Sequence, residues 1–225
     1  MRLAYTLLLT AAVAATTAYL VRPEGSATAA KETAYERVLR TGTLRCGYLT
    51  SFGYHNLDPN TKEMSGMVYD VINQMAKNLS LKVEWVEEIG RGDFIPALQQ
   101  GRFDLYCTAV SANAGRAREA LMTAPYYLDP VYVYGRAESP LIMDVSALNR
   151  ADLSYAVIEG DIFERIAQRY MPLAKPITLP QLTPVSELFV MLADGKTDMV
   201  IATPFFAQGY MQNTQAKSRV LRSSR

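Results

Sequence analysis

The feature that most constrains the fold is an alternation between two apolar periodicities, which runs along the chain twice. Short apolar runs alternate with longer segments in which apolar residues recur every three or four positions, as they do in residues 67–79. The first pattern predicts a strand and the second a helix. The order strand, helix, strand, helix, strand therefore predicts an α/β fold made of two βαβαβ halves with parallel sheets.

The pattern predicts bounds for each element. In the first half we expect a short leading helix over 34–39, strands over 44–49, 82–86 and 103–110, and helices over 67–79 and 94–99. In the second half we expect strands over 154–158, 176–179 and 198–202, and helices over 162–170 and 184–193. Ligands of such folds bind in the cleft at the carboxyl ends of the strands.

The two halves share a phrase between their last helix and last strand. It reads Leu98-x-x-Gly101-Arg102-x-Asp104 in the first half and Leu192-x-x-Gly195-Lys196-x-Asp198 in the second. The glycine suits a left-handed residue that ends a helix, and the basic residue suits the helix C-terminus. The phrase predicts one common turn used twice.

The first 29 residues have the pattern of a secretory signal. Arg2 precedes an apolar stretch over 3–21, and a polar, small-residue segment follows over 24–30. We expect cleavage after Ala29; the alternative is an uncleaved membrane anchor, because the stretch is nearly long enough to span a bilayer. Both readings predict an exported protein, located in the periplasm.

Charge and residue counts exclude several classes of function. The 23 Lys and Arg residues nearly balance the 22 Asp and Glu residues, so the net charge is +1. Proteins that bind nucleic acid usually carry a basic excess, and we therefore expect no nucleic-acid partner. One histidine and two cysteines leave no room for a Cys/His zinc site, so we expect no metal and no cofactor. The residues 213–225 form a basic tail, for which solvation is explanation enough.

One segment suits the capture of an anion. Thr108 and Ser111 lie among small residues at the end of a predicted strand, and Arg116 follows them. Hydroxyl groups and a guanidinium together can hold a carboxylate through charge-assisted hydrogen bonds. The alternative is that Arg116 and Arg118 are surface residues of a short helix.

Motifs spread over residues 35–210 resemble the bacterial extracellular solute-binding proteins of family 3, the receptors of polar amino-acid ABC importers. They are Val38-Leu39-x-x-Gly42-x-Leu44-Arg45-Cys46-Gly47, Tyr69-Asp70-Val71 in the helix after Gly66, Gly101-Arg102-Phe103-Asp104, and Arg116-x-x-Glu119 before Thr123-x-Pro125-Tyr126-Tyr127. The resemblance implies a two-lobe, type II periplasmic-binding (venus-flytrap) fold. It implies lobes over 30–128 and 137–212, joined by a hinge strand region over 129–136.

The resemblance also implies a function and partners. The cleft would close on a small amino-acid-like or carboxylate-bearing solute, and the protein would deliver that solute to the membrane permease subunits of an ABC importer. Arg116 falls on the family's arginine for the ligand α-carboxylate, and Ser111 on a hydroxyl that assists it. Phe52 matches an aromatic residue that lies against the ligand side chain.

Two positions depart from the family pattern. Asp161 stands where a hydroxyl residue usually helps to hold the carboxylate; it can cap its helix, but it would repel a ligand anion. Thr203 stands where an aspartate usually meets the ligand α-ammonium. Asp161 could partly replace that acid, so the ligand need not be a standard α-amino acid.

Cys46 and Cys107 lie on the first and third predicted strands, which are neighbours in the family's sheet. Export permits a disulfide. Adjacent parallel strands rarely suit its geometry, so a disulfide and two buried thiols both remain open.

Family members continue with a strand that returns to the first lobe and a C-terminal helix, so we expect the chain to be truncated before that return. Two other functions use the same fold. A periplasmic cyclohexadienyl or arogenate dehydratase would need an acid in the cleft, for which Glu159 and Asp161 are the local candidates. A ligand-sensing module would need a downstream membrane segment.

Overall fold

The computed structural model describes residues 32–137, 139, 144–213 and 220–224, and these divide between two compact units, Met1–Arg37 and Val38–Arg225. The predicted signal peptide and most of the basic tail lie outside the described residues. Helix α2 (Ala34–Thr41) begins in the first unit and ends in the second. The Thr33 hydroxyl accepts from the Glu36 backbone N–H at 3.2 Å, and the Glu36 carboxylate accepts from the Thr33 backbone N–H at 2.8 Å. This reciprocal pair is a capping box.

The first sheet of the second unit has three parallel strands in the order β4-β1-β5. They are β1 (Thr43–Tyr48), β4 (Lys82–Glu88) and β5 (Leu105–Tyr106). The strand predicted over 103–110 is wrong in its length, because only Leu105 and Tyr106 pair with β1. Cys107 still donates its N–H to the Gly47 carbonyl of β1 at 2.8 Å, and the chain then leaves the sheet. We call this sheet, with helices α3 (Met67–Asn78), α4 (Phe94–Gln99) and α5 (Ala114–Glu119), the first half.

The second sheet has five strands in the order β10-β6-β9-β7-β8. They are β6 (Tyr132–Arg136), β7 (Ser154–Ile158), β8 (Lys175–Leu179), β9 (Met199–Ala202) and β10 (Val220–Ser224). The strands β8, β7 and β9 are parallel and repeat the order of the first sheet, whereas β6 pairs antiparallel with β9 and β10 antiparallel with β6. The predicted hinge strand thus belongs to this sheet. We call it, with α6 (Ile162–Tyr170), α7 (Val185–Ala193) and α8 (Pro204–Asn213), the second half.

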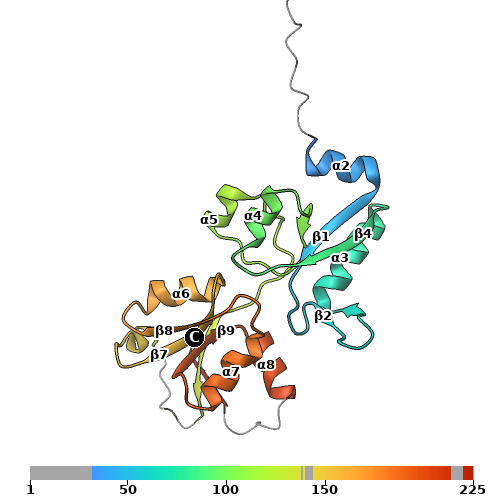
Figure 1. Ribbon diagram of the computed structural model, residues 1–225. Helices are drawn as coiled ribbons and strands as arrows, with labels where there is room; N and C mark the ends of the chain where they lie inside the picture. Colours follow the sequence, from blue (N-terminus) through green and yellow to red (C-terminus); the bar gives the residue numbers. More distant parts are fainter. Residues whose placement is uncertain (1–31, 138, 140–143, 214–219, 225) are drawn as a thin grey trace, which may run out of the picture. The chain divides into compact units, whose positions relative to one another are not determined.

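Helices cover both faces of the second sheet, which is why its central strands β7 and β9 are almost continuous apolar runs. Figure 1 shows α6 on one face and α7 with α8 on the other. Successive residues of β7 alternate between the two: Tyr155 and Val157 pack with Phe163 of α6, whereas Ala156 and Ile158 pack with Phe189 of α7. The first sheet is covered in the same way by α3 and α4, through two separate buried clusters.

Several short elements have no clear signal in the sequence. They are the hairpin of β2 (Asn56–Leu57) with β3 (Met64–Ser65), the 3-10 helix η1 (Val145–Leu148), α8 and β10. The hairpin strands are two residues long, too short for an alternating pattern. No helix in the described part of the chain is long and apolar enough to cross a membrane.

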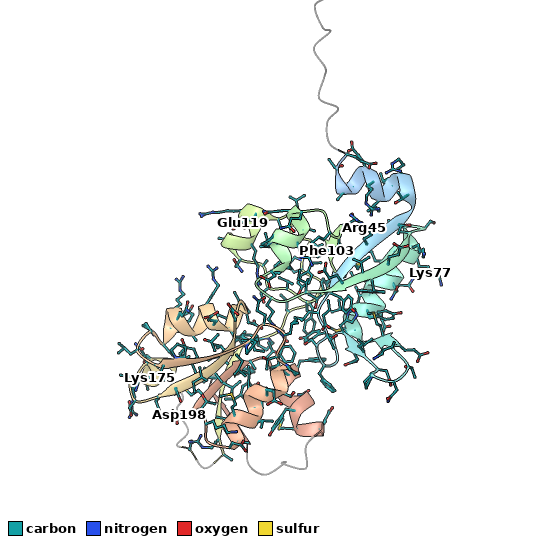
Figure 2. The ribbon with its side chains drawn as sticks, viewed as in Figure 1. Arg45, Lys77, Phe103, Glu119, Lys175 and Asp198 are labelled. Atoms are coloured by element: carbon teal, nitrogen blue, oxygen red, sulfur yellow. A yellow bond between two sulfur atoms is a disulfide. The ribbon has the colours of Figure 1, made fainter. Side chains whose placement is uncertain are left out.

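The shared phrase forms the same turn in both halves. Gly101 and Gly195 adopt φ values of +73° and +71°, and each donates its N–H to the leucine carbonyl three residues earlier, at 3.0 and 3.1 Å. The aspartate that follows accepts a backbone N–H from the neighbouring strand: Asp104 from Arg45 at 2.9 Å, and Asp198 from Ser154 at 2.8 Å. Figure 2 labels Arg45 in the first half and Asp198 in the second.

The first sheet is also tied covalently. Cys46 on β1 and Cys107, just after β5, form a disulfide with a Cα–Cα distance of 5.4 Å. Both residues are fully buried in the cluster under α3. The bridge closes a loop over a sequence separation of 61 residues, so it constrains the unfolded chain strongly.

Candidate functional site

A cavity of about 410 Å³ lies in the second unit, at the carboxyl ends of strands from both sheets. Its lining comes from residues 106–116 in the first half, from the extended segment 122–131, and from the start of α6 and the end of β9 in the second half. This volume suits a small molecule. The position agrees with the general rule that open α/β sheets bind ligands where their strands end.

Arg116 reaches across this cavity. The Asn113 side chain caps α5 by accepting the Arg116 backbone N–H at 3.1 Å, which fixes the start of the helix. The guanidinium donates to the Ser111 carbonyl at 2.9 Å and to the Gly160 carbonyl at 3.1 Å, and its carbon lies 5.3 Å from the centre of the Phe94 ring. Burial lowers the pKa of Arg116, and the nearby Asp161 carboxylate opposes that shift. The side chain stays charged, because arginine is not deprotonated in proteins.

Asp161 has one of its predicted roles, as a helix cap, and a partner that the sequence did not indicate. Its carboxylate caps α6 by accepting the Phe163 N–H at 3.4 Å, and it forms an ion pair with Arg91 at 2.8 Å. Both side chains are nearly buried, 11% and 13% exposed. Because Arg91 balances its charge, Asp161 repels a ligand anion much less than a lone carboxylate would.

Arg91 belongs to a group of contacts between the two halves. Its guanidinium donates to the Gln181 carbonyl at 2.7 Å, and the Gly92 N–H donates to the Gln181 side-chain oxygen at 2.8 Å. Gly160 lies so close to Gly92 that a Cβ on it would be 2.7 Å from the Gly92 nitrogen. These contacts hold the halves together beside the cavity.

A carboxylate and a phenol lie in another part of the lining. The Tyr54 hydroxyl donates to the Asp129 carboxylate at 2.7 Å. Burial raises the pKa of Tyr54 well above its usual range, and the Asp129 carboxylate adds to that shift. Thr203, 6% exposed, lines the cavity with them. The phenol is therefore a hydrogen-bond donor at any physiological pH.

The structure brings five of the six predicted binding residues into one lining: Thr108, Ser111, Arg116, Asp161 and Thr203. The sixth, Phe52, is not in that lining. Its half-exposed ring lies against α8, where a Cβ on Gly209 would be 2.5 Å from the ring. Aromatic rings of other residues line the cavity instead, namely Tyr54, Phe94, Tyr106, Tyr126, Tyr127 and Phe206.

The sequence analysis missed Arg91, Tyr54 and Asp129. The available signal for Arg91 was its position just after the second predicted strand, at the carboxyl edge where ligands bind.

Glu159, a candidate acid for catalysis, is exposed and absent from the lining. Among the described residues, no three His, Cys, Asp or Glu side chains are grouped so as to hold a metal ion.

The chain belongs to the bacterial extracellular solute-binding proteins, family 3, because the family model matches residues 44–157, just over half of its 225 residues. It is 27% identical to a probable ABC transporter extracellular-binding protein of Bacillus subtilis, over 76% of this chain and 59% of that one. It is 23% identical to the cyclohexadienyl dehydratase of Pseudomonas aeruginosa, over 76% of this chain and 63% of that one. The chain thus spans about three fifths of the length of these relatives.

A solved structure shows the same fold. The ancestral amino acid-binding protein AncCDT-1, described as a precursor of cyclohexadienyl dehydratase, superposes with a TM-score of 0.73 at 24% identity, over 85% of this chain and 82% of that one. The expected α/β, two-lobe, type II periplasmic-binding fold is therefore confirmed.

Proposed function

We propose that this protein is an extracytoplasmic receptor that captures a small, carboxylate-bearing solute between its lobes and delivers it to the permease of an ABC importer. The lobes would be residues 30–128 and 137–212, with 129–136 as the hinge strand region. The family and the name of the Bacillus subtilis relative support this function. They also support a location in the periplasm and a permease partner.

The observation that carries the proposal is the position of the Arg116 guanidinium. It is partly buried at the cavity and bonded to carbonyls of both halves, so it is already oriented before a ligand arrives. A fixed guanidinium binds a carboxylate without losing further side-chain entropy. The Ser111 and Thr108 side chains lie in the same lining and add hydrogen-bonding hydroxyls.

Calorimetric titration of the 225-residue chain with amino acids, keto acids and small carboxylates tests the proposal. We expect one class to bind, and Arg116→Ala to weaken that binding by roughly 10- to 100-fold, the usual loss for a hydrogen bond to a charged group. Arg118→Ala is the matched control, because Arg118 is exposed on the same helix. Unchanged affinity in Arg116→Ala would remove Arg116 from the site, and no binding by the wild-type chain would overturn the receptor function.

A dehydratase is the second candidate, supported by the Pseudomonas aeruginosa relative. Such an enzyme needs a cavity acid. Asp161 is paired with Arg91 and Glu159 lies outside the lining, which leaves Asp129. Turnover of prephenate or arogenate that Asp129→Asn abolishes would support the enzyme. Tight binding of a solute without turnover would support the receptor.

A further inference from the structure

The disulfide joins two chain segments that run directly into the cavity lining. Cys46 lies on β1, and the chain that leaves this strand supplies Leu49 and Ser51 to the lining. Cys107 is followed at once by a continuous run of lining residues, 108–112. The bridge therefore fixes the spacing of two walls of the cavity close to the point where both leave the sheet.

The two strands that the bridge connects are held very differently. The strand β1 is central in its sheet, with β4 on one side and β5 on the other, and all six of its residues pair with β4. The strand β5 pairs with β1 over two residues only, and Cys107 adds one hydrogen bond, from its N–H to the Gly47 carbonyl at 2.8 Å. The bridge thus ties a weakly held strand to the central strand of the first half.

Residues 108–112 have few other anchors. Within the described part of the chain, none of their backbone N–H groups donates a hydrogen bond to the protein. Val110 is partly buried and packs beside the buried cluster at α4. At the far end, Asn113 caps α5, and the Arg116 guanidinium donates to the Ser111 carbonyl at 2.9 Å. Without the bridge, these contacts alone would have to hold the segment in its bound shape.

We infer that the Cys46–Cys107 disulfide is a positioning element of the binding site, which holds residues 108–112 in the shape that a solute needs. Solute affinity, as well as stability, then depends on the bridge. The inference rests on the proposed receptor function. A segment that is already ordered binds without losing backbone entropy, whereas a loosened segment must be ordered by the solute. Ordering one or two residues corresponds to roughly 10- to 100-fold in affinity.

The test compares a variant without the bridge with a matched control, by calorimetric titration in the cold. The probes are the common L-amino acids, pyruvate, 2-oxoglutarate and succinate, titrated into the oxidised 225-residue chain. Cys46→Ala combined with Cys107→Ala should weaken binding of every probe that the wild-type chain binds, by roughly 10- to 100-fold. Val68→Ala is the control, because Val68 is fully buried in the same cluster as both cysteines. It lowers stability but keeps the bridge, so each affinity should stay within about threefold.

Two further variants separate positioning from a general loss of stability. Cys46→Val combined with Cys107→Ala refills the cluster without a bridge, and it also serves if the alanine pair fails to fold. It should recover part of the stability and none of the affinity. Adding Arg116→Ala to a chain without the bridge should cost less affinity than Arg116→Ala costs in the wild-type chain. The reason is that the bridge acts through the segment that positions this guanidinium, so the two effects are coupled.

The outcomes separate this inference from the function on which it rests. A folded variant without the bridge that binds as tightly as the wild-type chain would overturn the inference and leave the receptor function intact. An equal loss of affinity in Val68→Ala would do the same, and so would losses that simply multiply when Arg116→Ala is added. No binding of any probe by the wild-type chain would overturn both proposals.

Discussion

The first half and the second half place the same turn before their third strand, yet they hold that strand differently. In the first half, β5 has two residues and β1 as its one described neighbour, and the disulfide ties the chain just after it. In the second half, β9 has four residues and lies between β7 and β6. The sheet registers make Tyr155 and Ile201 the counterparts of Cys46 and Cys107.

The difference indicates which interactions hold the third strand of each half in its sheet. Tyr155 and Ile201 are each 1% exposed, so apolar packing occupies the place of the disulfide in the second half. Because β9 has a neighbouring strand on each side, it forms backbone hydrogen bonds along both edges. A two-residue strand with one described neighbour has few such bonds, and a covalent bond compensates for them. The following predictions test this comparison.

The largest effect is expected from loss of the disulfide. Cys46→Ala combined with Cys107→Ala should lower the free energy of unfolding by about 4 kcal/mol, because the closed loop is long. Urea unfolding without reductant measures the loss. Adding reductant should destabilise the wild-type chain by a similar amount and leave the double variant unchanged. A wild-type chain that is insensitive to reductant during unfolding would contradict the role given to the bridge.

The two turn aspartates should differ in importance. Asp104 is almost fully buried, 2% exposed, and accepts from the backbone and the charged guanidinium of Arg45. Asp198 is 36% exposed and accepts from the backbone and the neutral hydroxyl of Ser154, with Arg136 3.7 Å away. Asp104→Ala should therefore cost about 3 kcal/mol, since it leaves buried donors without a charged partner, and Asp198→Ala about 1 kcal/mol. Urea unfolding of both variants checks the order. Equal costs would mean that the burial of the carboxylate does not decide its contribution.

Acid should weaken the first half selectively, because the chain's one histidine lies there. His55 is fully buried against the rings of Tyr48, Tyr69 and Trp85, and burial lowers its pKa while the Glu88 carboxylate opposes the shift. As the pH falls, His55 becomes protonated in the unfolded chain below about pH 6.5, and in the folded chain only at a lower pH. The free energy of unfolding is therefore highest above that pH and decreases below it, by at most about 1.4 kcal/mol per pH unit.

Urea unfolding between pH 7.5 and pH 5 measures this slope, and His55→Gln should flatten it. Hydrogen exchange should show the loss of protection in β1 and β4 before β7 and β8. A slope that persists unchanged in His55→Gln would assign the pH dependence to other groups.

The smallest loss of stability, and an equal loss in the two halves, is expected from substitution of the two turn glycines. Gly101→Ala and Gly195→Ala each place a methyl group on a left-handed residue, which costs about 1 kcal/mol. The added Cβ meets nothing within 4 Å at Gly101 and only the Arg136 guanidinium at 3.9 Å at Gly195. Both variants should lose the same stability in thermal unfolding. A difference well above that cost would show that the two turns are not equivalent.

The sequence predicted the regular elements better than their ends. The bounds of α4, α6 and β7 agree with prediction because turn residues and a change of apolar period mark both ends. The strand over 103–110 was predicted too long, since Phe103 is buried although it precedes the two residues that pair with β1. Apolar residues report burial, and burial alone does not distinguish a strand from a buried loop.

The candidate site was predicted from one continuous segment and, for Asp161 and Thr203, from the family resemblance. Thr108, Ser111 and Arg116 lie in one segment, and all three line the cavity. Tyr54 and Asp129 are 75 residues apart, and Arg91 and Gln181 are 90 residues apart, so no local pattern joins them. Phe52 lies against Gly209 of α8, 157 residues further along the chain, which spacing alone does not reveal.

The close approach of Gly160 to Gly92 leaves no room for a side chain at position 160. With no side chain at either position, the two backbones meet directly, and a Cβ at Gly160 would lie 2.7 Å from the Gly92 nitrogen. A larger residue at position 160 would clash with the Gly92 backbone and push the two segments apart. It would also have to adopt the left-handed backbone conformation of Gly160, which costs free energy. A single position outside the pocket lining thus sets the spacing of two backbone segments beside the cavity, and mutation there changes that spacing without altering a residue of the lining.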